Sequence, residues 1–219
     1  RWPVHEFVPT YHVFEIPNNE HMRELFLQLL EYRKSAYRDT PVIIKDISRT
    51  PDIYRSSDIK SRISGNLFLS RDSAFLKIRA GKEPQRQLLE WLHSHGYFTP
   101  GGSFNLLFRV RASISYLLNF AVLMDYDRIV LCGVDMVDSE YFFMTDKYRN
   151  KDIPIPEPKI TETDRVHPTN DGSGRITLEE LIYLINDTIL ITEDINLYVE
   201  NEKSALYPRV PVYAYPSLD

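Results

Sequence analysis

Apolar and polar positions succeed one another in a way that predicts strands and helices in turn. Residues 10–16 are rich in β-branched and aromatic side chains, which is typical of a strand. Apolar residues then recur every three or four positions over 22–30, so we expect an amphipathic helix capped by Asn18 or Asn19. The run 41–47 is almost wholly apolar, which predicts a strand buried on both faces.

The same alternation continues through the second half of the chain. Thr177 and Glu180 have the spacing of a capping box, which marks the start of a helix. Gly96 is placed to end another helix. By these patterns we expect helices over 83–95, 110–125 and 177–188, with strands over 66–69, 128–135 and 195–199. Alternating strands and helices predict an α/β fold with a mostly parallel sheet covered on both faces.

Three segments lack a sustained period. Residues 48–64 predict an exposed connection, and the tail from residue 207 contains prolines that predict an extended chain. Residues 136–166 contain several prolines and aromatic residues, so we interpret them as a long, lid-like excursion.

Composition and charge narrow the class of protein. The chain has 219 residues, of which 43% are hydrophobic and 26% are charged, so we expect one soluble globular domain over 1–219. The formal net charge is −5, and Lys and Arg are scattered, which argues against a nucleic-acid partner.

The cysteine content and the length of the apolar runs indicate the cellular compartment of the protein. Cys132 is the single cysteine, so no internal disulfide can form and a reducing compartment is favoured. Its apolar neighbours predict that Cys132 is a buried, inert core residue. No apolar run approaches the roughly 20 residues that span a bilayer, and the start lacks a signal-peptide pattern. We therefore expect a cytoplasmic protein. The first residue is not Met, so we expect either that a donor-binding segment precedes Arg1 in a longer chain or that the donor is bound differently.

Candidate chemistry gathers near the end of the predicted strand 128–135. Ligands of open parallel sheets bind beyond the carboxyl ends of the strands, which is where Gly133 and Asp135 fall. The simpler interpretation of these two residues is a strand-ending turn. His167 follows the lid-like excursion and could take a proton from a hydroxyl, although a loop histidine is more often merely solvated.

Residues 169–180 imitate a calcium loop, but the first ligand position holds Thr169 instead of a carboxylate. We therefore assign Thr177 and Glu180 to the helix cap and expect no metal site. A phosphate-cradling P-loop and the common dehydrogenase, zinc-protease and hydrolase motifs are absent from the sequence.

Over residues 104–207, Arg111-Ala-Ser113 opens an apolar helix, a strand ends in Gly133-Val-Asp135, and an aromatic segment beginning at Tyr141 precedes His167. This order of features resembles the bacterial lipooligosaccharide sialyltransferase family. The resemblance implies a Rossmann-like glycosyltransferase domain with a lid, acting without metal or cofactor. Its substrates would be a nucleotide sugar, with a CMP-sugar expected, and a glycan acceptor for lipopolysaccharide or capsule. It leaves open peripheral association with the inner face of the membrane and assembly as a homo-oligomer.

The resemblance also implies roles for individual residues. His167 would be the general base, and Tyr141 would bind the donor phosphate. The nucleotide would be lined by Arg111, Ser113, Gly133, Val134 and Asp135. Three features depart from the family pattern. Met136-Val137 replaces a second phosphate-binding tyrosine, and the family's Gly/Asn-rich donor loop has no counterpart. The family arginine ahead of the serine matches only loosely, to Arg109 or Arg111. A noncatalytic nucleotide- or glycan-binding module and a Rossmann-like methyltransferase are the alternative hypotheses.

Overall fold

The computed structural model describes most of the regular elements of the chain. The described residues are 8–15, 20–45, 57–72, 81–102, 106–107, 110, 112–134, 136 and 176–216. They form two compact units, which are described separately. Unit 1 comprises Arg1–Ala74 and Phe104–Leu107, and unit 2 comprises Phe75–Ser103 and Phe108–Asp219. The prediction of a single domain over the whole chain stays a prediction.

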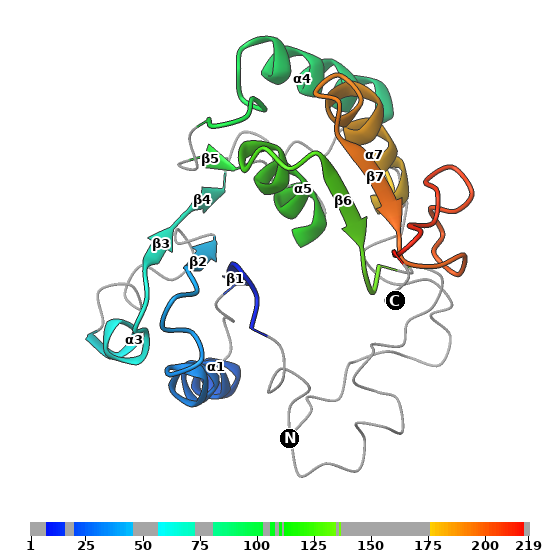
Figure 1. Ribbon diagram of the computed structural model, residues 1–219. Coiled ribbons are helices and arrows are strands. Elements are labelled where there is room, and N and C mark those ends of the chain that lie inside the picture. The colour runs from blue at the N-terminus through cyan, green and yellow to red at the C-terminus, as the bar shows by residue number, and fades with distance from the viewer. Residues whose placement is uncertain are drawn as a thin grey trace. The chain divides into compact units, whose positions relative to one another are not determined.

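Unit 1 is built on short parallel strands (Figure 1). Strands β1 (His12–Glu15), β2 (Val42–Lys45) and β3 (Leu67–Leu69) form a parallel sheet in the order β1-β2-β3. All four residues of β2 are buried, which confirms the predicted strand buried on both faces. A second parallel pair joins β4 (Arg71–Asp72) to β5 (Leu106–Leu107), and neither of these two-residue strands was predicted.

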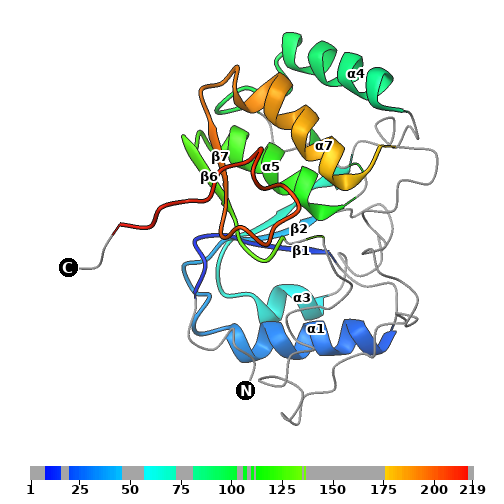
Figure 2. The same ribbon diagram turned by 90° about the vertical axis from the view of Figure 1, so that its right-hand side faces the viewer.

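Two helices of unit 1 lie on the same side of this sheet in both views (Figures 1 and 2). They are α1 (Glu20–Arg33), as predicted, and α3 (Ser57–Arg62). The helix α3 falls in the segment expected to be an exposed connection, so that prediction was wrong in part. Ile59 explains the difference, because it is only 2% exposed and joins Phe26, Leu30 and Ile44 in the core of the unit.

Unit 2 pairs β6 (Arg128–Leu131) with β7 (Asn196–Val199) in parallel register. The segment after β7 returns beside it through a parallel bridge between Val199 and Val212. Helices α4 (Lys82–Ser94), α5 (Ser113–Leu123) and α7 (Leu178–Ile185) were all predicted, but α5 begins three residues later than expected.

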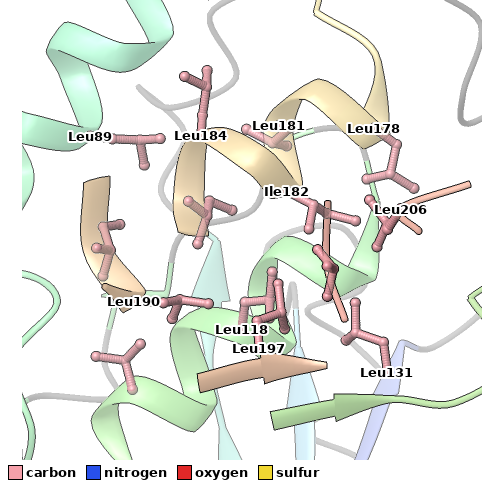
Figure 3. Packing of buried hydrophobic residues seen from close by; sticks show 14 of the residues in the cluster. Leu89, Leu118, Leu131, Leu178, Leu181, Ile182, Leu184, Leu190, Leu197 and Leu206 are labelled. Atoms are coloured by element: carbon pink, nitrogen blue, oxygen red, sulfur yellow. The ribbon is translucent and has the colours of Figure 1, made fainter. Parts of the chain in front are cut away.

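One hydrophobic cluster joins the helices of unit 2 to one face of the β6–β7 pair. Leu118 of α5 and Ile182 of α7 lie against Leu131 and Leu197 of the two strands (Figure 3). Leu89 extends the cluster into α4. The strands present their alternate, inward residues to this cluster, as the two-residue period of a strand requires.

A short π-helix, η5 (Asn186–Leu190), extends α7 toward β7. Ile191 N donates to Asn186 O over five residues at 3.0 Å. Beyond the π-helix, the Glu193 carboxylate contacts His93 Nε2 of α4 at 2.5 Å.

The helices and parallel strand pairs of the two units make the chain a mixed α/β protein with short parallel strands. Within the described ranges, none of the helices has both the length and the apolar character needed to cross a membrane.

Candidate functional site

The connection between α5 and β6 brings two predicted site segments to the same end of unit 2. A short turn of residues 124–127 reverses the chain, so the helix and the strand run in opposite directions. The 11-residue helix and the four-residue strand have similar lengths, roughly 16 Å and 13 Å. The amino end of α5, with Ser113, therefore lies toward the carboxyl end of β6. Ile114 and Val134 accordingly pack against the same core cluster.

Gly133 makes the turn at which β6 ends. Its φ is +68°, a left-handed conformation that L side chains adopt at a cost. A Cβ atom added there would meet no atom within 4 Å, so the backbone conformation, and not crowding, requires glycine. This turn exposes Cys132 and Gly133 beyond the strand. The strand-ending turn, the simpler interpretation of Gly133, is therefore present in the structure.

The loop after β7 is fastened to the loop after β6. The Ser204 hydroxyl, which is buried, donates to the Val134 carbonyl at 2.9 Å. Asn201 Oδ1 accepts from Lys203 N at 2.9 Å and shapes the same loop. Both loops follow the carboxyl ends of neighbouring parallel strands, which is where ligands of α/β proteins bind.

The amino ends of α5 and α7 differ in whether acidic residues already occupy them. Thr177 Oγ1 accepts from Glu180 N at 3.1 Å, and Glu180 Oε2 accepts from Thr177 N at 2.9 Å. This capping box confirms the predicted helix start and already places carboxylates at the amino end of α7. The first turn of α5 carries no acidic residue, and Ser113 is exposed there. The positive end of the α5 dipole is therefore the one suited to an anion.

A buried serine supports this end of α5. Ser115 Oγ donates to the Val110 carbonyl at 2.8 Å and accepts from Val110 N at 3.0 Å. Ser115 is fully buried, so these bonds hold the chain entering α5 in place. Sequence reasoning missed this role, and the signal available was only a polar residue on a mostly apolar helix.

The predicted site residues divide between described and undescribed parts of the chain. The structure places Ser113 at the amino end of α5, and Gly133 and Val134 just beyond β6. The other predicted residues lie outside the described residues: Arg111, Asp135, Tyr141 and His167. Of the lid-like excursion over 136–166, only Met136 is described; it is buried in the core of unit 2.

Cys132 contradicts its predicted burial. The thiol is exposed and lies 3.8 Å from the Tyr215 hydroxyl, so the expectation of an inert core cysteine was wrong. The reason is register: Leu131 takes the inward position, and the next residue must point to the opposite face. Hydrogen bonding to this thiol raises the pKa of Tyr215 above its ordinary value.

Unit 1 has its own cluster of polar groups, around His12. Its Nδ1 atom shares a hydrogen bond of 2.6 Å with the Tyr37 hydroxyl, and its ring stacks on Phe14 at 3.7 Å. The guanidinium of Arg33 lies 4.9 Å from the centre of the Tyr37 ring. Burial, together with the charge of Arg33, lowers the pKa of His12 to about 4. Because His12 stands at the start of β1, this cluster lies at the amino end of that strand. Ligands of parallel sheets are expected at the opposite, carboxyl end.

Metal ligands do not gather in the described part of the chain: no group of three His, Cys, Asp or Glu side chains there could hold an ion. Comparison with known proteins adds no further assignment. No family model matches the chain, and no curated protein and no solved structure matches it.

Proposed function

We propose that the chain is an inverting, sialyltransferase-like glycosyltransferase that acts in the cytoplasm. It would transfer a sugar from a nucleotide donor, a CMP-sugar, to a glycan acceptor of the cell surface. The observation that carries the proposal is the acid-free amino end of α5 beside the Gly133 turn, at the carboxyl end of a parallel strand pair. A Rossmann-like arrangement of the whole chain belongs to the same proposal.

This end of unit 2 suits the leaving group of such a transfer. When the acceptor oxygen attacks the anomeric carbon, the bond to the donor phosphate breaks and negative charge grows on that phosphate. The backbone N–H groups of the first turn of α5 and the exposed Ser113 would stabilise this charge. The exposed backbone at Gly133 would contact the nucleoside. His167, from the resemblance, would accept the acceptor's proton.

Nucleotide binding is the first test, because a ligand that binds the native state raises its stability. We would measure the melting temperature of the full chain with CMP, UDP, GDP and S-adenosylmethionine at matched concentrations. CMP should give the largest rise, corresponding to about 2.7 kcal/mol at one hundred times its Kd. A larger rise with S-adenosylmethionine would favour the methyltransferase instead, and no rise with any nucleotide would overturn the proposal.

Ser113→Asp separates folding from binding at the proposed phosphate site. The new carboxylate suits the helix dipole by about 0.3–1 kcal/mol, so the free protein should stay folded. The same charge should abolish the CMP-induced rise in melting temperature, while Ser113→Ala should retain most of it. An undiminished rise in Ser113→Asp would place the nucleotide elsewhere.

His167→Ala tests catalysis apart from binding. Transfer from a CMP-sugar to a glycan acceptor should fall by about a hundredfold or more, with the CMP-induced stabilisation unchanged. The matched control is His95→Ala, since His95 is an exposed histidine at the end of α4. Binding of CMP without transfer by the unmodified chain would instead support a noncatalytic module.

A further inference from the structure

One face of the β6–β7 pair is lined with tyrosines and charged residues instead of core residues. The inward residues Leu131, Leu197 and Val199 are buried in the cluster beneath the helices. The intervening residues, which a strand directs to the opposite side, form what we call the tyrosine face: Arg128, Cys132, Tyr198, Glu200, Tyr213 and Tyr215. Arg128, Cys132, Glu200 and Tyr215 are exposed, and Tyr215 keeps 60% of its surface in solvent.

The tyrosine face is an ordered surface. The guanidinium of Arg128 donates to the Tyr213 hydroxyl at 2.6 Å. Tyr213 makes edge-to-face contacts with Tyr198 at 5.3 Å and with Tyr215 at 4.9 Å between ring centres. Rings held in this way lose little conformational entropy when a partner covers them, and Tyr and Arg are the side chains enriched where proteins associate. Parallel sheets, moreover, are normally covered on both faces.

Charges of opposite sign stand at the two ends of the tyrosine face. In the register of the sheet, Arg128 pairs with Asn196, so Glu200 lies four residues further along the strands. At about 3.3 Å per residue the two charges are about 13 Å apart along the strand direction, too far to pair within one chain. Val130 and Tyr198, which lie on this face between Arg128 and Glu200, are uncharged.

The tyrosine face is self-complementary in charge, because its two ends carry charges of opposite sign. We propose that the tyrosine face binds a second copy of the chain, face to face and with the strands of the two copies antiparallel. A two-fold axis at the level of Val130 and Tyr198 would bring Arg128 of each copy to the level of Glu200 of the other. The remaining sideways offset is one strand spacing, about 4.8 Å, which an arginine side chain spans. The two ion pairs are then equivalent, as a two-fold interface requires.

The test is the oligomeric state of the full chain and of charge-reversed variants, measured by sedimentation equilibrium. The unmodified chain should dimerise. Arg128→Glu and Glu200→Arg should each weaken the dimer by about tenfold or more, because like charges then oppose each other twice. Lys82→Glu makes the same change of charge as Arg128→Glu at the exposed start of α4, on the helix side, and should leave the dimer unchanged.

Mixing the two variants distinguishes this geometry from other modes of association. An Arg128→Glu chain and a Glu200→Arg chain restore both ion pairs when they meet, so the mixture should form a heterodimer that neither variant forms with itself. Circular dichroism of each variant, compared with the unmodified chain, verifies folding. If one variant fails to fold, the doubly reversed R128E/E200R chain should recover the homodimer. A monomeric unmodified chain, or a dimer indifferent to both reversals, would overturn the proposal.

Discussion

At the scale of single residues, His12 has the most perturbed environment among the described histidines. It is half-buried beside the Tyr37 hydroxyl, and the Arg33 guanidinium opposes a second positive charge nearby. The sequence alone does not single out His12, since a histidine in a short strand carries no signal of its environment. The packing of β1 against the segment after α1 creates this environment.

The lowered pKa of His12 predicts that acid destabilises the folded state. Its pKa is about 4 in the native protein and 6.5 in the unfolded chain, so the unfolded chain binds more protons between these values. The free energy of unfolding should therefore decrease as pH falls from about 6.5 to 4, by at most about 1.4 kcal/mol per pH unit from this group. Urea unfolding across this pH range measures the slope.

His12→Gln removes the titrating group and should make this pH dependence shallower. The exposed His95, changed to Gln, is the matched control and should leave the slope as in the unmodified chain. Equal slopes in all three proteins would show that His12 does not couple protonation to folding.

At the scale of elements, local signals succeeded where they were strong. The capping box at Thr177 and Glu180 and the helix end at Gly96, with its φ of +78°, could be recognised from the sequence alone. The π-helix could not, because its bonds depend on how the end of α7 meets α4 and β7. The short helix α3 was missed because its six residues hold too few apolar positions to establish a period.

Removing the cap of α7 should destabilise unit 2 measurably. Thr177→Ala deletes the oxygen that accepts from Glu180 N and should lower the free energy of unfolding by about 1 kcal/mol. Thr177→Ser keeps this oxygen and should remain within a few tenths of the unmodified chain. Urea unfolding compares the three proteins, and an alanine variant as stable as the serine variant would contradict the role of the cap.

At the scale of the whole molecule, two hydrophobic clusters underlie the two compact units. In unit 2, Ile182 is fully buried between α5, α7 and the strands (Figure 3). Ile191, nine residues later, is 63% exposed. The same amino acid is therefore buried within α7 and exposed just after η5.

This contrast predicts different costs for the same substitution. Ile182→Ala leaves a cavity in a close-packed core and should lower the free energy of unfolding by about 2–5 kcal/mol. Ile191→Ala is the matched control and should change it by about 0.5 kcal/mol at most. Denaturant unfolding measures both, and similar losses would mean that Ile182 is not part of the stabilising core.

The sequence by itself determined the alternation of strands and helices, the capping box and the buried character of β2, because these follow from local propensity and periodicity. It also placed Ser113 at the opening of a helix, and Gly133 and Val134 at the end of the strand that follows. Only the tertiary structure decided that Cys132 faces solvent, that Ser204 fastens the loop beyond β7 to Val134, and that tyrosines of β7 and the tail share a face with Arg128. These contacts join residues up to 85 positions apart, and no local pattern specifies which distant segments meet.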